Sequence, residues 1–280
     1  MNIKIVPATQ LSHSEVITFL NADNLSFRHL DWLTPIDRIS QPGCFALVSG
    51  QELRALLSCE PENPQTAWLR LFASFRDGNH ARYFSLLLAE AQGYLRSLDI
   101  PNLYALALHG WLETLLKSVG FQVDNHIVTL MRRTESLPQC VFQPDIIIRL
   151  MTARDLGELQ LVDQASFPPA WQLNPANLLK SYQASFHSTV ALHQGQLIGY
   201  QITTSTFTTA HLARLAVLPK FQGYHIGEAL LTEMLTDCLE QGISEITVNT
   251  QLNNNASLNL YQKFDFRSVD RPLPVYKNIL

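Results

Sequence analysis

The chain has 280 residues, of which 46% are hydrophobic and 16% are charged, and its formal net charge at pH 7 is −4. This length suits two domains of roughly 140 residues each, and the composition suits a soluble globular protein with an apolar core. A pI near 6.1 disfavours nucleic acid or an anionic membrane surface as the main partner. We therefore expect a globular protein that acts on neither nucleic acid nor membranes.

The cysteines and the N-terminus indicate a reducing compartment. Cys44, Cys59, Cys140 and Cys238 lie far apart in apolar surroundings and have no metal-ligand spacing. We interpret them as buried thiols. Residues 1–10 lack a basic segment followed by an apolar one, and no apolar run reaches membrane-spanning length. These features predict a cytoplasmic protein without a metal site.

The chain contains two copies of one unit, displaced by 145 residues. Three pairs of landmarks give this same difference: 148–150 with 3–5, Gly223 with Gly78, and Phe266 with Phe121. The segment 134–145, which contains two prolines, is predicted as a linker. The expected domains are therefore 1–133 and 146–280.

The second copy alternates strands and helices. Its predicted elements, in chain order, are a strand at 146–152, a helix at 155–164, a proline-containing loop at 167–171, a hairpin of strands at 188–193 and 196–204, a strand at 212–218, a helix at 226–239, a strand at 245–250, a short helix at 255–263 and a last strand at 266–276. The first copy follows the same coarse order. The expected fold class is α/β, with two tandem domains that are each a twisted mixed sheet flanked by helices.

A glycine-containing loop, Gln222–Ala229, joins the strand at 212–218 to the long helix. Pro219 holds the turn, and Gly223 and Gly227 allow the backbone to approach a ligand closely. Backbone N–H groups and the positive end of the helix dipole then converge on one spot, which is typical of a phosphate site. The alternative is an ordinary strand–loop–helix connection. A Walker loop and a dinucleotide fingerprint are both excluded by the spacing.

This loop resembles motif A of the GCN5-related N-acetyltransferases (GNAT), Arg/Gln-x-x-Gly-x-Gly/Ala after an apolar strand. Gln222, Ile226 and Gly227 fit the pattern, and Gly223 fits a common variant of it. His225 departs from the pattern, because it stands where the first glycine normally lies.

A second block, residues 254–266, is similar to the same family's Asn-x-x-Ala/Ser-x-x-Leu-Tyr-x-x-x-Gly-Phe. The matching residues are Asn254, Ser257, Leu260, Tyr261 and Phe266, while Asp265 replaces the glycine. The resemblance covers 146–280 through both blocks and 1–133 only through its shape.

The resemblance implies that acetyl-CoA is the cosubstrate, that an acetyl group passes directly to a primary amine, and that no metal takes part. CoA would lie between the fourth and fifth strands, with the Val217 N–H polarising the thioester carbonyl. By this resemblance the cofactor-binding residues are Leu215, Ala216, Val217, Gln222, Gly223, Tyr224, His225, Ile226, Gly227, Glu228, Ala229, Asn254 and Ser257.

Two residues are candidates for proton transfer. Tyr261 would protonate the departing thiolate, since a phenol with a pKa of about 10 suits this leaving group; the alternative is an aromatic side chain that only packs in the core. Asn249 stands where the N-terminal acetyltransferase branch has a glutamate. His211 aligns with a strand glutamate of other members and could be the base; a water chain is the alternative.

The acceptor side is indicated by the loop from Phe167 to Trp171, which resembles a Phe-Pro-x-x-Trp loop of that branch. It would form one wall of the acceptor channel, or it is a proline-rich corner with Trp171 in the core. The acceptor remains open between a protein N-terminus, a polyamine, an amino sugar and another small amine. A homodimer is also left open.

The first copy lacks most of the residues that carry the resemblance in the second copy. Its loop at 77–82 keeps one glycine, and Asp77 places a carboxylate where a phosphate would lie. Leu116 and His109 stand at the positions of the tyrosine and the asparagine. The first domain is therefore predicted to be inactive, and to pack against the second or shape its acceptor cleft. A second class of function for the whole chain is a non-catalytic acyl-CoA-binding sensor or scaffold.

Overall fold

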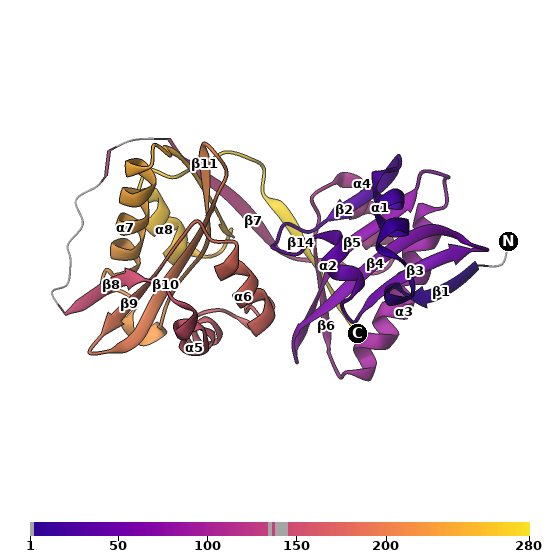
Figure 1. The fold of residues 1–280 in the computed structure, drawn as a ribbon, viewed down its shortest axis with the longest axis horizontal. Helices are drawn as coiled ribbons and strands as arrows, with labels where there is room; N and C mark the ends of the chain where they lie inside the picture. Colours follow the sequence, from indigo (N-terminus) through magenta and orange to yellow (C-terminus); the bar gives the residue numbers. More distant parts are fainter. Residues whose placement is uncertain (1–2, 134–135, 138–144) are drawn as a thin grey trace. The chain divides into compact units, whose positions relative to one another are not determined.

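The computed structural model describes residues 3–133, 136–137 and 145–280 (Figure 1). They form two compact units: unit 1 comprises Met1–Asp124 and Leu273–Leu280, and unit 2 comprises Asn125–Pro272. Most of the predicted linker, together with Cys140, lies outside the described residues. The other three cysteines are buried and unpaired, as the sequence predicts.

Unit 1 is a mixed sheet with four helices. Its strands are β1 (Ile3–Pro7), β2 (Asn24–Arg28), β3 (Cys44–Ser49), β4 (Glu52–Asn63), β5 (Thr66–Phe75), β6 (Asn102–Leu106) and β14 (Leu273–Ile279), and its helices are α1 (His13–Asn21), α2 (Pro35–Ile39), α3 (His80–Ser97) and α4 (Gly110–Ser118). The sheet order is β1-β3-β4-β5-β6-β14, with β2 added to β5. β5 and β6 run parallel, and the pairs β1–β3, β3–β4, β4–β5, β2–β5 and β6–β14 are antiparallel.

Unit 2 repeats this plan. Its strands are β7 (Gln122–Arg132), β8 (Ile146–Leu150), β9 (His187–His193), β10 (Gln196–Ser205), β11 (Thr209–Val217), β12 (Glu245–Gln251) and β13 (Arg267–Ser268), and its helices are α5 (Leu156–Ser166), α6 (Pro175–Gln183), α7 (Ile226–Glu240) and α8 (Asn255–Lys263). The sheet order is β8-β9-β10-β11-β12-β7, and β11 and β12 run parallel. The expected α/β class with mixed sheets is confirmed in both units.

The units differ from the predicted domains at their last strands. β7 comes from the first half of the chain but pairs with β12, through Ile127 to Arg132. β14 comes from the second half but pairs with β6, through Val275 to Ile279. The predicted last strand at 266–276 is therefore two strands, β13 and β14. The repeat gives the order of elements along the chain, but it does not encode which sheet edge a strand joins.

In unit 2 the helices cover both faces of the sheet. α5 and α6 pack on one face, where Leu159 and Leu178 share an apolar cluster with Ala216 of β11. α7 and α8 pack on the other, where Met234 and Tyr261 share a cluster with Leu212 of β11. Helix α7 has the predicted apolar spacing, and the residues it buries are Ile226, Ala229, Leu230, Leu231, Met234, Leu235 and Cys238.

Helix α6 was not predicted from the sequence, although its start carries a signal. Asn174 caps it by accepting the Asn177 N–H at 2.8 Å, and Pro175 follows at the first helical position. Across the described ranges, no helix has both the length and the apolar composition needed to cross a membrane.

Candidate active site

The parallel strands β11 and β12 part in the middle of the sheet. Their pairing joins Thr209–Leu212 to Glu245–Val248 and stops there, although β11 continues to Val217. The strand bulges at this point, because Ala213 falls between two residues that pair with consecutive residues of β10. Beyond the bulge, no strand of the described chain pairs with β11 on the β12 side. We call this opening the fork.

Two backbone N–H groups point into the fork. The Leu218 N–H donates to the Ile198 carbonyl of β10 at 2.8 Å, and Ala216 lies opposite Tyr200 of the same strand. Because successive residues of a strand direct their backbone groups to opposite sides, the N–H groups of Leu215 and Val217 face the fork. An extended ligand could pair with them as a strand would.

The loop after β11 presents further unpaired N–H groups. The first hydrogen bond of α7 runs from the Ala229 N–H to the His225 carbonyl at 3.0 Å. The N–H groups from Gly223 to Glu228 have no hydrogen-bond partner among the described residues. They lie at the positive end of α7, where the sequence predicts an anion site, and the binding of an anion there remains a prediction.

Gly227 allows the loop to lie close to α8. A Cβ atom at this position would be 3.3 Å from Cδ2 of Leu260 and 4.0 Å from Cγ2 of Val217. A larger residue would therefore press the start of α7 away from both the second block and the fork.

His225 stands at a position that favours glycine for a conformational reason. It has φ of 61°, in the left-handed region. Its imidazole Nδ1 lies 3.1 Å from Glu228 Oε1, and Lys263 Nζ lies 2.5 Å from Glu228 Oε2. Burial raises the pKa of Glu228, but the hydrogen bonds from Lys263 and His225 outweigh this effect and lower it. The imidazole of His225 therefore points toward Glu228. The Glu228 carboxylate, in the first turn of α7, contacts both His225 and Lys263.

The second block places Tyr261 at the base of the fork. Tyr261 is 5% exposed and shares an apolar cluster with Leu212 and Val248, the last residues that β11 and β12 pair. Its hydroxyl makes no hydrogen bond to the described residues. Burial raises the pKa of Tyr261, which keeps the phenol protonated at neutral pH.

Asn254 has a local structural role in this block. Its side chain caps α8 by accepting the Ser257 N–H at 3.2 Å. Ser257 is half-buried on the same turn. The structure therefore explains Asn254 as a helix cap, and the cofactor contact predicted for these two residues remains a prediction.

His211 lies on the opposite face of the sheet from Tyr261. Its neighbours Ala210 and Leu212 point into the cluster under α7 and α8, so the alternation of the strand directs His211 to the other face. Its Nδ1 lies 2.8 Å from Thr247 Oγ1 of β12. Burial lowers the pKa of His211, so the ring is neutral at pH 7 and can accept a proton. Asn249 is exposed, two residues beyond Thr247 on β12.

The loop predicted on the acceptor side lies against this same face. Phe167 packs against the apolar cluster under α5, and Trp171 ends a short 3-10 helix, Pro169–Trp171. Trp171 is half-buried and does not belong to the buried cores, so the interpretation of it as a core residue is wrong.

A buried ion pair near this loop was not found from the sequence. Asp163 of α5 is fully buried, and its Oδ2 accepts hydrogen bonds from Arg214 Nε at 2.9 Å, Arg214 Nη2 at 2.6 Å and the Tyr200 hydroxyl at 2.5 Å. Its Oδ1 accepts the Leu173 N–H at 2.9 Å. An arginine inside an apolar strand and an aspartate inside an apolar helix are unusual unless they are paired. These two charged residues in apolar segments are the feature of the sequence that could have indicated the ion pair.

Unit 1 has the same fork but fills it. Its β5–β6 pairing also stops early, at Trp68 opposite Tyr104. Beyond this point β2 pairs with β5, from Leu71 opposite Arg28 to Phe75 opposite Asn24, while β4 pairs with the other edge of β5. A strand of the chain itself therefore occupies the edge that an extended ligand would need.

The loop of unit 1 also carries its own anion. The Asp77 carboxylate accepts the Asn79 N–H at 2.9 Å and the Tyr83 hydroxyl at 2.8 Å. Leu116, in the register of Tyr261, is fully buried. The inactivity of the first copy remains a prediction.

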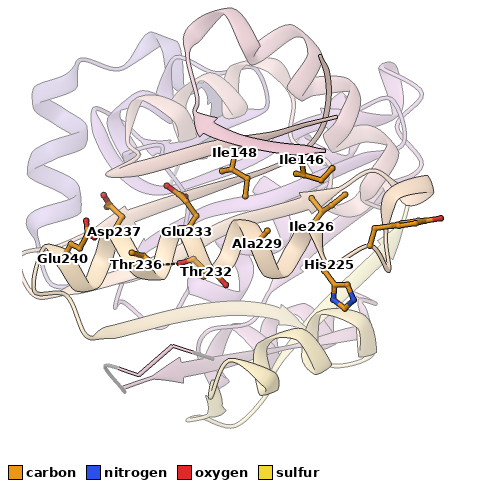
Figure 2. A pocket seen from close by; sticks show the side chains of 11 residues that line it. Ile146, Ile148, His225, Ile226, Ala229, Thr232, Glu233, Thr236, Asp237 and Glu240 are labelled. Atoms are coloured by element: carbon orange, nitrogen blue, oxygen red, sulfur yellow. Dashed lines mark hydrogen bonds between the residues drawn. The ribbon is translucent and has the colours of Figure 1, made fainter. Parts of the chain in front are cut away.

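A groove of about 460 Å³ lies elsewhere in unit 2, between β8 and α7 (Figure 2). Ile146 and Ile148 lie on one side, and Glu233, Asp237 and Glu240 follow one another along α7 on the other. It shares Tyr224, His225, Ile226 and Ala229 with the predicted cofactor-binding residues. β9 and β10 separate β8 from the fork in the sheet. The groove therefore adjoins the predicted cofactor site at the start of α7 and extends away from the fork.

Known proteins share both the motifs and the fold. Residues 157–266 match the model of the acetyltransferase (GNAT) family. A ribosomal protein bS18-alanine N-acetyltransferase of Haemophilus influenzae is 28% identical over 125 residues, covering 44% of this chain and 83% of that protein.

Two solved structures cover nearly the whole chain. A tandem GNAT protein from the clavulanic acid biosynthesis pathway has a TM-score of 0.62 at 14% identity, covering 99% of this chain and 98% of that one. A GCN5-related N-acetyltransferase from Kribbella flavida has a TM-score of 0.68 at 12% identity, covering 100% and 71%. With the fork, the loop before α7 and both sequence blocks in unit 2, residues 157–266 belong to the acetyltransferase (GNAT) family, and the whole chain has the fold of a tandem GNAT protein.

Proposed function

We propose that unit 2 transfers an acetyl group from acetyl-CoA directly to a primary amine. The observation that carries this proposal is the fork between β11 and β12, which opens beside the unpaired N–H groups of residues 223–228. A ligand with an anionic pyrophosphate and an extended amide-containing arm matches both features. Acetyl-CoA has this chemistry, and the pyrophosphate would lie at the start of α7 with the arm along β11.

The reaction follows from the groups at the fork. The amine nitrogen attacks the thioester carbonyl carbon, and the Val217 N–H stabilises the oxyanion that forms. The C–S bond then breaks, and Tyr261 donates its proton to the leaving sulfur. The proton lost by the amine passes to His211, directly or through water.

The positions of the acid and the base support a direct transfer. Tyr261 lies on the face covered by α7 and α8, whereas His211 lies on the face that carries Phe167 and Trp171. A cofactor bound at the start of α7 would therefore meet an acceptor that arrives from the other face. Because the Haemophilus influenzae relative is named as a ribosomal protein bS18-alanine N-acetyltransferase, a peptide N-terminus is the first acceptor to test.

A non-catalytic acyl-CoA-binding role is the alternative, and the exposed Asn249 in place of a glutamate favours it. Thiol release from acetyl-CoA, measured with a panel of peptides and small amines, separates the two. Acetyl-CoA should raise the melting temperature under either function. Release of thiol with at least one amine supports the acetyltransferase function. A rise in melting temperature without any turnover supports the non-catalytic binding role. The absence of both excludes CoA binding altogether.

A further inference from the structure

Arg214 carries a fixed positive charge on the acceptor face of β11. Its side chain is 12% exposed, and its guanidinium lies 3.6 Å from the centre of the Phe167 ring. Nε and Nη2 bond to Asp163, and Nη2 also donates to the Trp171 carbonyl at 2.6 Å. The guanidinium is thus held against both the acceptor loop and helix α5.

This guanidinium lies near the point where acyl transfer would occur. Arg214 directly follows the bulge at Ala213 and comes three residues before Val217, whose N–H faces the fork. Leu215 and Val217 direct their side chains toward α7, whereas Arg214 and Ala216 direct theirs toward α5. The cofactor is expected on the α7 side, so Arg214 lies on the side from which the acceptor comes.

One nitrogen of Arg214 remains available for a ligand. Nη1 makes no hydrogen bond to the described residues, and it is not among the fully buried polar atoms that lack a partner. Nη1 is therefore not fully buried, while the other two nitrogens are fixed by their hydrogen bonds. Because Asp163 balances the charge, the pair presents oriented donors without a large net repulsion toward an incoming ammonium group.

We propose that Arg214 binds the acceptor through Nη1, which donates to a carbonyl or carboxylate oxygen next to the reacting amine. The preferred acceptor is then an α-amino acid derivative or a peptide N-terminus rather than a simple alkylamine. This inference rests on the proposed acetyltransferase function and adds the acceptor class to it. Arg214 would be a substrate-binding residue, and Asp163 and Tyr200 would position it.

The test compares acceptors that differ only in the oxygen-bearing group. Thiol release is measured with L-alaninamide, L-alanine and isopropylamine for the unaltered protein and for Arg214→Lys, which keeps the charge but loses the Nη1 donor. We expect kcat/KM for alaninamide to fall roughly tenfold or more in the variant, and that for isopropylamine to change by less than about twofold. KM for acetyl-CoA should stay the same. The comparison of kcat/KM for L-alanine with that for L-alaninamide shows whether Arg214 binds a carboxylate oxygen as well as an amide carbonyl oxygen.

Arg149→Lys is the matched control, because Arg149 makes a bidentate pair with Asp155 at the other end of α5. This variant should leave the ratio between the acceptors unchanged. An equal loss with alaninamide and isopropylamine in Arg214→Lys would overturn the proposal, since it would mean that Arg214 only supports the loop.

Two measurements keep the test decisive if the variant folds poorly or turnover is absent. An unaltered protein that uses isopropylamine as well as alaninamide contradicts the proposal without any variant. Calorimetric titration of alaninamide into the CoA-loaded protein needs no turnover, and the absence of binding there overturns the acceptor assignment. Acetyl-CoA that fails to stabilise the protein instead overturns the proposed function itself.

Discussion

His211 Nδ1 lies 2.8 Å from Thr247 Oγ1, across the last paired stretch of β11 and β12. The contact orients the imidazole at the base of the fork and leaves Nε2 free of any hydrogen bond to the described residues. Burial lowers the pKa of the ring, because it disfavours the charged form.

The first prediction concerns pH. Because the pKa of His211 is lowered, the neutral base is present at pH 7, and kcat should fall only as the pH drops below the usual histidine pKa of about 6.5. In His211→Gln this acidic limb should disappear and kcat should drop roughly 10²-fold or more. The measurement is kcat against pH from 5 to 9. If the dependence of kcat on pH were unchanged in the variant, the proton of the amine would pass to water and not to His211.

The second prediction concerns Tyr261→Phe. The hydroxyl makes no hydrogen bond to any residue that the structure describes, so its removal should change the melting temperature little, whereas kcat should fall roughly 10²-fold through the loss of the acid. KM for acetyl-CoA should stay nearly constant. Tyr276→Phe in unit 1, whose hydroxyl donates to Glu113 at 2.9 Å, is the control and should keep full activity. Full turnover by Tyr261→Phe would leave this residue with a packing role alone.

The third prediction concerns two glycines that share a positive φ, a conformation in which a residue with a side chain would be strained. Gly223 has φ of 82° and Gly242 has φ of 77°, and an added Cβ would meet nothing within 4 Å at either position. Alanine at each should lower the free energy of unfolding by about 1–2 kcal/mol. Only Gly223→Ala should also weaken acetyl-CoA binding, measured by calorimetry, because it disturbs the anion loop. Equal affinities in the two variants would place the pyrophosphate elsewhere.

The fourth prediction concerns β7 and β14, because each of them pairs with a strand from the other half of the chain. A fragment 125–272 contains the strands of unit 2, whereas 146–280 lacks β7 and with it Arg132, which is fully buried and donates to the Phe264 carbonyl at 3.0 Å. We expect the first fragment to unfold cooperatively and bind acetyl-CoA, and the second to aggregate through its open β12 edge. Circular dichroism and light scattering report this difference. Two equally stable fragments would show that β7 is dispensable.

Several features of the protein were readable from the sequence because they depend on residues close together in the chain. The apolar spacing of 226–239 fixes α7, the turn and glycines of 219–227 fix the anion loop, and the block at 254–266 fixes α8 with Tyr261 on its buried side. The loss of these features in the first copy was readable for the same reason. Local periodicity and turn chemistry act over a few residues, so a single sequence displays them.

What the tertiary structure decided depends on residues far apart in the chain. The choice of β7 over β14 as the neighbour of β12 is a choice between two strands with similar patterns. The pairing of Arg214 with Asp163, 51 residues apart, and the orientation of His225 toward Glu228 beside Lys263 depend on which helices meet at the sheet. A buried charge is stable only where its partner is brought to it, and the sequence shows the charge but not the partner.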